Sequence, residues 1–313
     1  MHILLTGGCG YIGTVLTQKL LDLGMQVTVV DAMWFGNYLT EHKNLRVVKE
    51  DIRNVDNIPM QGVDIVIHLA NIANDPCGEL DPKLSWEVNV LSTMRLVEHA
   101  IRNNVKQFIY ASSGSVYGVK DEPNVTEDLS LVPISDYNKT KMVSERVLLS
   151  YNDNIAVQII RPATVCGYSP RMRLDLSVSM LTIAALTKKL ITVFGGNQTR
   201  PNIHIQDMTD VYLHFVKNGD KFRGTYNAGF ENMSIMEIAK AVQKVVPAEI
   251  AVAESNDPRS YRLNSDKLLA TGFKPKHTVE DGIKDVVEAF KLNNITDDDS
   301  CFNIRVMKNL DSL

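Results

Sequence analysis

The strongest constraint on the fold lies in the first 31 residues, MHILLTGGCGYIGTVLTQKLLDLGMQVTVVD. A short apolar run, 3–5, predicts a buried strand that leads directly into the glycine-rich turn 6–13. Apolar residues then recur at helical spacing until Gly24, and a second apolar run, 27–30, ends at Asp31, 18 residues beyond the last glycine of the turn. A strand, a glycine turn, a helix and a second strand ending in an acid form the sequence context of a dinucleotide site.

Each part of this pattern has a chemical reason. Glycine lets the backbone approach a pyrophosphate and lets the helix pack on its strand, while the helix N-terminus favours negative charge. Asp31 would accept hydrogen bonds from an adenosine ribose and repel a 2′-phosphate, so the pattern favours NAD over NADP. The turn residues expected to bind this coenzyme are Gly7, Gly10, Tyr11, Ile12 and Gly13. The alternative is an ordinary α/β turn that happens to be rich in glycine.

Composition narrows the class of protein. The 313 residues are 44% hydrophobic and 22% charged, as in an ordinary globular protein, and the net charge of −4 includes no basic tract that would suggest nucleic acid or an anionic membrane. No apolar run is long enough to span a bilayer, and no signal-peptide pattern precedes the first strand. The four cysteines are scattered and the histidines show no metal-binding spacing, so we expect neither a disulfide framework nor a metal site. A reducing cytoplasm is the expected location.

The rest of the chain predicts a Rossmann-type doubly wound parallel sheet with a smaller C-terminal substrate-binding α/β domain. Further strands are expected at 45–49, 63–68, 108–111 and 157–161, with helical patterns between most of them. We assign residues 1–165 to the NAD-binding domain, to which 202–228 is expected to return, and residues 166–295 to the substrate domain. The tail, 296–313, is acidic and then mixed without clear periodicity, which predicts a loosely packed or partner-ordered extension.

Two loops and one helix supply further coenzyme candidates. Asp51 and Ile52 follow the third strand, where a carboxylate would accept from the adenine amine; a solvated loop acid is the alternative. Small residues after the next strand suit a backbone close to the coenzyme, and this stretch is Leu69, Ala70 and Asn71. Its neighbour His68 is expected to be a packed strand-end residue.

Residues 82–103 carry apolar side chains at three- and four-residue steps and predict one long helix. Asn89 interrupts its buried stripe. A buried amide needs partners, so Asn89 is either a local packing residue or an anchor of the coenzyme site and its catalytic groups.

The candidate chemistry follows the strand 108–111, because ligands of open α/β sheets bind at the carboxyl ends of strands. A serine-rich stretch, 112–118, comes directly after that strand, and Tyr137 and Lys141 lie four residues apart on one face of a helix that extends to about residue 151. An ammonium one turn away and a nicotinamide cation nearby would favour the phenolate and bring the pKa of Tyr137 from about 10 towards neutrality. A serine across the cleft would hold the substrate oxygen. This arrangement predicts proton removal coupled to hydride transfer.

Together these motifs resemble the extended short-chain dehydrogenase/reductases, in the NAD-dependent epimerase/dehydratase branch, over about residues 1–292. The resemblance implies that Ser113, Tyr137 and Lys141 are catalytic, that Lys141 also binds the nicotinamide ribose, and that Pro162 contacts the coenzyme. It implies a nucleotide-sugar substrate whose hydroxyl, usually at C4, is oxidised to a ketone.

Departures from the family pattern are informative. The 4,6-dehydratases carry Asp-Glu after the catalytic serine or threonine, whereas this chain has Gly114 and Ser115, so 4,6-dehydration is not expected. The frequent Arg-x-x-Asn motif ends here in Thr164.

Asp207 is expected to be a structural helix N-cap. The residues expected to bind substrate are Ser113, Thr164, Arg171, Arg173, Arg200 and Arg259, although the arginines at 171 and 173 are alternatively a solvated charge cluster.

Several functions remain open at this level. A nucleotide-sugar 4-epimerase is preferred because the serine and tyrosine are intact and no additional catalytic carboxylate is recognised in the sequence. A 4-dehydrogenase or 4-ketoreductase is the alternative, since residues 161–175 and 257–262 resemble enzymes such as GDP-heptose 4-dehydrogenases. A decarboxylase of nucleotide-linked uronic acids and a non-catalytic dinucleotide-sensing scaffold are further options. The helices that begin at Pro82 and near Tyr137 are apolar on more than one face. Members of the family that the chain resembles pair such helices into a four-helix dimer core, so the resemblance implies a homodimer.

Overall fold

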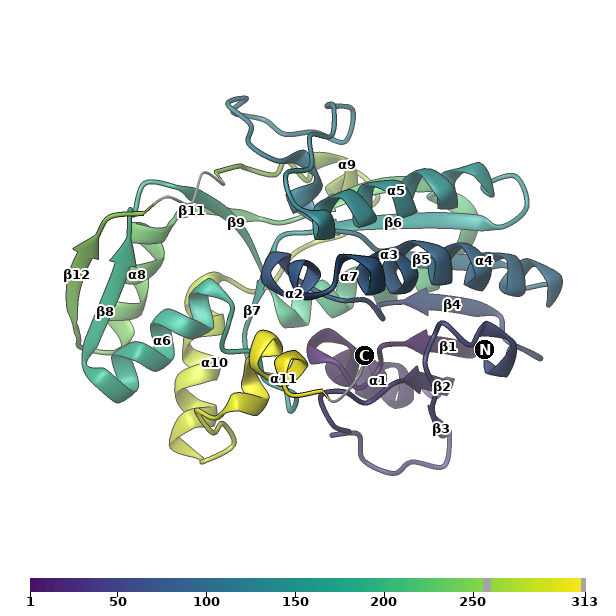
Figure 1. Cartoon of the computed structure of the whole chain (residues 1–313), viewed down its shortest axis with the longest axis horizontal. Coiled ribbons are helices and arrows are strands. Elements are labelled where there is room, and N and C mark those ends of the chain that lie inside the picture. Colours follow the sequence, from purple (N-terminus) through teal and green to yellow (C-terminus); the bar gives the residue numbers. More distant parts are fainter. Residues whose placement is uncertain (256–259, 311–313) are drawn as a thin grey trace.

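The computed structural model describes residues 1–255 and 260–310, and its central element is a seven-stranded parallel sheet (Figure 1). The strand order is β10-β6-β5-β4-β1-β2-β3. The chain order reverses on either side of β1, which pairs with β2 along one edge and with β4 along the other. Ligands bind at such a switch point. The strands are β1 (His2–Thr6), β2 (Gln26–Asp31), β3 (Leu45–Lys49), β4 (Ile65–His68), β5 (Gln107–Ala111), β6 (Ala156–Pro162) and β10 (Gly224–Ala228). The predicted doubly wound parallel sheet is confirmed.

The turn after β1 requires glycine at two positions. Gly7 has φ of 74°, and a Cβ there would lie 2.6 Å from the backbone nitrogen of Ala70. A Cβ on Gly13 would lie 2.2 Å from the carbonyl oxygen of Gly7. Because both positions lack a side chain, the backbone can turn tightly enough for α1 (Tyr11–Asp22) to begin just after β1. The N-terminus of α1 then faces the space beyond the sheet.

The helix predicted over 82–103 is divided by a π-helical turn. It consists of α3 (Pro82–Trp86), the π-turn η2 (Glu87–Leu91) and α4 (Ser92–Arg102). Asn89 lies inside this turn and is buried. Single π-turns inside helices frequently occur at functional sites.

A second module extends from the carboxyl ends of these strands. It contains a three-stranded sheet of β11 (Glu231–Ser234), β9 (Thr199–His204) and β7 (Thr164–Cys166), and a pair of β12 (Glu249–Ala253) and β8 (Leu190–Phe194). Its helices are α6 (Ser177–Lys188), α8 (Ile235–Val245) and α10 (Val279–Lys291). Figure 1 shows β8, β12 and α8 at the end of the molecule remote from β1, β2 and β3.

The remaining helices connect and cover these parts. The segment between β9 and β10 forms α7 (Ile205–Asn218), which packs against α1, where Lys19 forms a 2.6 Å ion pair with Asp210. No helix in the described part of the chain is long and apolar enough to cross a membrane. The other helices are α2 (Asp75–Leu80), α5 (Asp136–Ser150), α9 (Asp266–Leu269) and α11 (Asn303–Lys308), with 3₁₀ turns at Val55–Asn57, Gly114–Tyr117, Gly219–Lys221 and Asp299–Cys301.

Asp207 is structural, as expected, but it is not a helix N-cap. The N-cap of α7 is His204, whose side chain accepts a hydrogen bond from the backbone of Gln206. The buried carboxylate of Asp207 instead accepts hydrogen bonds from the backbone nitrogens of Lys276 and His277 and from the His277 ring. It therefore fastens the loop before α10 to α7, a contact between residues about 70 positions apart that local sequence does not show.

The expectation of a loosely packed tail was wrong for residues 299–310. The backbone nitrogen of Leu174 donates a 2.9 Å hydrogen bond to the carbonyl of Cys301. Asn303 and Met307 of α11 are 4% and 3% exposed, and Met307 belongs to a core cluster beneath the large sheet. A helix of only six residues is too short to display a periodic apolar pattern.

A buried ion pair joins α5 to the large sheet. Arg161, on β6, donates from Nε and Nη2 to the two carboxylate oxygens of Glu145 at 2.9 and 2.6 Å, and both side chains are almost fully buried. The hydroxyl of Ser112 donates to the same carboxylate at 2.5 Å. The ion pair therefore fixes α5, which carries Tyr137, to β6, and Ser112 links the same carboxylate to the end of β5, next to Ser113.

We predict that Glu145→Ala lowers the free energy of unfolding by about 3–5 kcal/mol, because it leaves the Arg161 guanidinium buried without its carboxylate. Urea unfolding measures this change. The control Arg146→Ala, at an exposed position of the same helix, should change the stability by no more than about 0.5 kcal/mol. Glu145→Leu combined with Arg161→Met should recover most of the loss, and a double variant less stable than the single variant would contradict the account.

Candidate active site

A cleft of about 660 Å³ opens at the carboxyl ends of β1, β4 and β5, between the large sheet and the second module. This volume is typical of a ligand pocket. Every described residue predicted to bind coenzyme or substrate lines the cleft except Asn89 and Lys141. The predicted site residues that line the cleft are Gly7, Gly10, Tyr11, Ile12, Gly13, Asp31, Asp51, Ile52, Leu69, Ala70, Asn71, Ser113, Tyr137, Pro162, Thr164, Arg171, Arg173 and Arg200. Arg259 lies outside the described residues.

One end of the cleft has the features that a dinucleotide requires. The Asp31 carboxylate accepts hydrogen bonds from the backbone nitrogens of Cys9 at 2.9 Å and Met33 at 2.7 Å, which fixes it at the end of β2. Burial raises the pKa of Asp31, and the two backbone donors and the Arg171 charge oppose that rise. Asp51 also lines the cleft, where Arg53 donates to its carboxylate at 2.8 Å. The glycine cradle, the facing helix N-terminus and the fixed acid together fit an adenosine diphosphate.

Asn89 supports the wall of the cleft from behind. Its side-chain oxygen accepts from the backbone nitrogen of Ile72 at 2.9 Å, and its amide donates to the Ile72 carbonyl and to the Thr140 hydroxyl. These contacts make Asn89 an anchor that ties the loop after β4 to α5. Of the two roles that the sequence left open, the structure favours the anchoring one.

His68 is the packed strand-end residue that the sequence predicts. Its ring is 1% exposed and hydrogen-bonds through Nδ1 to Thr6 and through Nε2 to Thr93. Burial and the Lys141 charge lower the pKa of His68 to about 3, so the ring is neutral at physiological pH.

Tyr137 and Lys141 lie one turn apart at the start of α5, which Ser135 caps by accepting from the backbone of Asn138. The ammonium of Lys141 donates to the carbonyl of Ala111, at the end of β5, at 2.7 Å and lies 6.0 Å from the centre of the Tyr137 ring. Burial lowers the pKa of Lys141 to about 7 and raises the pKa of Tyr137 to about 12, the latter opposed by a hydrogen bond with Ser113. Burial thus opposes the predicted fall in the tyrosine pKa, because it disfavours the charged form of both groups.

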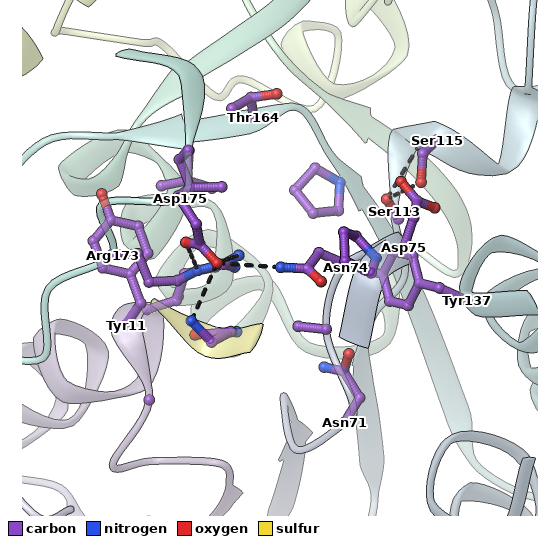
Figure 2. Close-up of a pocket in the computed structure, with 18 of the residues that line it drawn as sticks. Tyr11, Asn71, Asn74, Asp75, Ser113, Ser115, Tyr137, Thr164, Arg173 and Asp175 are labelled. Atoms are coloured by element: carbon purple, nitrogen blue, oxygen red, sulfur yellow. Dashed lines mark hydrogen bonds and ion pairs between the residues drawn. The ribbon is translucent and has the colours of Figure 1, made fainter. Parts of the chain in front are cut away.

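The serine side of the site is a short hydrogen-bonded chain. The hydroxyls of Ser113 and Ser115 lie 2.7 Å apart, and Ser115 in turn donates to the side-chain oxygen of Asn138 on α5. Figure 2 shows Ser113, Ser115 and Tyr137 on one side of the cavity. Ser115, where dehydratases have an acid, therefore orients the serine that faces Tyr137.

An acid that the sequence did not reveal lies beside Ser113 and Tyr137. Asp75, at the start of α2, accepts a 2.5 Å hydrogen bond from Ser135 and lines the cleft beside Ser113 and Tyr137 (Figure 2). Its charge contributes to the raised pKa of Tyr137. The preceding residue, Asn74, has φ of 75°, which residues other than glycine rarely adopt. The loop after β4 carries Asp75 to the site, 62 positions before Tyr137, and no recognised motif marks it.

The two predicted arginines of the loop after β7 occupy different surroundings. Arg173 forms a bidentate ion pair with Asp175, which also accepts from the Asn74 side chain at 3.2 Å (Figure 2). Burial alone would raise the pKa of Asp175, but the Arg173 and Arg171 charges hold it below its usual value. Arg171 has no ion pair in the described part of the chain and packs over Phe35, on the Asp31 side of the cleft. They do not form a solvated charge cluster, because Arg171 is 3% exposed and the Arg173 side chain is 13% exposed.

Comparison with known proteins places the chain in a family. Residues 3–229 match the family model described as the NAD dependent epimerase/dehydratase family, which covers more than two thirds of the chain. The chain belongs to this family. It is therefore an NAD-dependent enzyme of the extended short-chain dehydrogenase/reductase type, as its motifs predict.

Several known proteins are similar to this chain over nearly its full length. The chain is 29% identical over 308 residues to a putative UDP-glucose 4-epimerase of Methanocaldococcus jannaschii, a match that covers 94% of this chain and 100% of the relative. The structure of UDP-glucose 4-epimerase from Thermotoga maritima with UDP-glucose is similar with a TM-score of 0.84 at 25% identity, covering 94% of this chain and 99% of the other. UDP-glucuronic acid 4-epimerase from Bacillus cereus, in complex with UDP-glucuronic acid and NAD, has a TM-score of 0.82 at 27% identity and coverages of 94% and 100%.

Proposed function

We propose that this enzyme is a nucleotide-sugar 4-epimerase that oxidises the C4 hydroxyl of its substrate and then reduces the resulting ketone from the opposite face. The observation that carries the proposal is that Tyr137 and Ser113 share one cleft with the glycine cradle of β1. Their hydroxyls can therefore reach a sugar held beside the nicotinamide end of the coenzyme. The relatives named as UDP-glucose 4-epimerases support this choice.

The proposed roles follow from the geometry. NAD, when bound, supplies a hydride acceptor at the sugar carbon and a hydride donor for the return. Tyr137 takes the proton of the C4 hydroxyl and later gives it back to the same oxygen. Ser113, whose hydroxyl donates to Ser115 in the free protein, turns this donor to the sugar oxygen when substrate binds. Lys141, fixed by the Ala111 carbonyl, lends positive charge that favours the phenolate and is the proposed contact of the nicotinamide ribose. Inversion requires that the ketone rotates without leaving the cleft.

The second module supplies the proposed contacts for the nucleotide and sugar. Thr164, Arg173 and Arg200 line the cleft on that side and are the proposed described contacts, together with Arg259 from the 256–259 segment. The arginines are suited to the diphosphate of the substrate. UDP-glucose is the first substrate to test, because it is named for several relatives.

Asp75 bears on the choice between epimerisation and related reactions. The recognised motifs contain no carboxylate besides the coenzyme-binding acids, and this favours a 4-epimerase. In the structure, however, Asp75 lies beside Tyr137. A 4-keto sugar is acidified at its neighbouring carbons. A carboxylate base that removes a proton there, with loss of a β-hydroxyl as water, would carry out an elimination. We retain the epimerase proposal because Ser135 donates to Asp75 and thereby engages it in capping α5.

We predict that the purified enzyme converts UDP-glucose or another nucleotide sugar to its C4 epimer without net formation of NADH. Proton NMR of the product and absorbance at the NADH band, followed in the same sample, measure both quantities. Stoichiometric accumulation of NADH without a C4-inverted sugar would replace the proposal with a 4-dehydrogenase. A dehydrated product would instead make Asp75 the catalytic base of an elimination, and release of carbon dioxide from UDP-glucuronate would indicate a decarboxylase.

We further propose a homodimer built from the helical segment 82–102 and α5. The support is apolar surface on the first of these: Trp86 is 36% exposed and Leu91 is 47% exposed. A second copy of the same face would bury these side chains against half-buried residues of α5 such as Met142 and Val143.

Sedimentation velocity at micromolar concentration should therefore give twice the 35.0 kDa chain mass. Leu91→Glu should shift the protein towards the monomer, because it places a charge in the proposed interface. Leu292→Glu, at a 62% exposed leucine beyond α10, is the control and should leave the dimer intact. A monomeric wild-type protein would contradict the proposal.

We also propose a cytoplasmic location. All four cysteines are free and buried, which suits a reducing compartment.

A further inference from the structure

The loop that follows β7 crosses directly over the glycine turn. The Tyr11 hydroxyl donates to the carbonyl of Gly167 at 2.6 Å, and the Ser169 hydroxyl donates to the carbonyl of Tyr11 at 2.7 Å. Tyr11 is the first residue of α1 and stands immediately after the glycine at position 10. The loop is therefore fixed at the end of the cleft where a dinucleotide pyrophosphate would lie.

Arg171, two residues beyond Ser169, carries a buried charge with few partners. It is 3% exposed and lines the cleft, with its guanidinium centre 4.3 Å from the centre of the Phe35 ring. Nη2 donates to Asn303 Oδ1 at 2.6 Å and Nη1 makes only a 3.4 Å contact with the Met172 carbonyl. Nε has no hydrogen-bond partner within residues 1–255 and 260–310. A buried cation without a carboxylate partner is costly unless an anion neutralises it.

The guanidinium of Arg171 packs on the coenzyme side of the cleft. Its charge acts to lower the pKa of both Asp31 and Asp175, and its guanidinium packs on Phe35, just beyond the strand that ends in Asp31. Arg173, by contrast, acts on Tyr137 and is already neutralised by Asp175. The anion that Arg171 faces is thus expected on the coenzyme side of the cleft.

The folded tail holds this arginine in place. Asn303, the first residue of α11, accepts from Arg171 and donates through its backbone nitrogen to Asp175 at 3.3 Å. Asn303 and Ile304 line the cleft themselves, and Ile304 packs with Trp34 and Phe35 on one core cluster. Figure 1 shows α11, near the C-terminus, close to α2, and the two helices contact each other.

We propose that Arg171, oriented by Asn303 and Phe35, binds the pyrophosphate of NAD, and that the tail 299–310 thereby retains the coenzyme between catalytic cycles. This assignment moves Arg171 from the expected sugar-nucleotide site to the coenzyme site. It rests on the NAD dependence of the family and not on the proposed 4-epimerase activity.

Coenzyme binding, measured without any sugar, tests the proposal. Arg171→Met should weaken NAD binding by about 10- to 100-fold, the loss expected for one charge-assisted hydrogen-bonding group, and should lower the NAD content of the purified protein. Asn303→Ala should weaken binding in the same direction by a smaller factor, and Arg171→Lys should recover part of the affinity. Arg305→Met, which removes an exposed arginine from the same helix, is the matched control and should bind NAD as the wild type does.

Thermal unfolding with ligand fragments identifies the group that Arg171 contacts. ADP-ribose should raise the melting temperature of the wild type more than that of Arg171→Met, whereas adenosine, which lacks phosphate, should shift both equally. The apo Arg171→Met protein should melt no lower than the wild type, because the substitution removes an unpaired buried charge. NAD and ADP-ribose affinities within twofold of the wild type would overturn the proposal, and a raised KM for the nucleotide sugar in that case would return Arg171 to the substrate site. An apo protein that melts lower, with unchanged NAD affinity, would make Arg171 merely structural.

Discussion

The close approach of three backbone segments at the end of β1 is the constraint on which the rest of the structure depends. Gly7 lies against the loop after β4, and Gly13 of α1 lies against Gly7, so neither position has room for a side chain. This contact opens the space at the switch point of the sheet and directs the N-terminus of α1 into it. Coenzyme binding, the position of Asp31 and the crossing of the second module over Tyr11 all follow from that geometry.

Buried polar side chains, more than apolar packing, align the reacting groups. Asn89 ties the loop after β4 to α5, the Arg161–Glu145 pair ties α5 to β6, and Ser135 joins α5 to Asp75. The first and third links join α5, which carries Tyr137, to the segment after β4, and the second joins it to β6. The same packing that positions the pair raises the pKa of Tyr137 and lowers that of Lys141, because burial disfavours the charged form of both groups.

The sequence predicted those parts of the site whose residues lie close together in the chain. The glycine turn, Asp31, the serine-rich strand end and the Tyr137–Lys141 spacing all use short-range patterns, and the structure brings them to one cleft or its wall. Contacts between distant segments were not predictable: the tail that folds onto Arg171, the loop that Asp207 fastens, and Asp75 beside Tyr137. A π-turn at Asn89 was also missed, because periodicity does not distinguish it from an α-helix.

The central claim is that the phenol of Tyr137 exchanges a proton with a sugar hydroxyl whose carbon gives its hydride to NAD. Turnover of Tyr137→Phe, measured beside its NAD content, tests this claim most directly. The account predicts that kcat falls by about 10²- to 10⁴-fold, the usual contribution of general acid–base catalysis, while the amount of NAD bound per chain stays that of the wild type. A variant that keeps its coenzyme and turns over as fast as the wild type would contradict it.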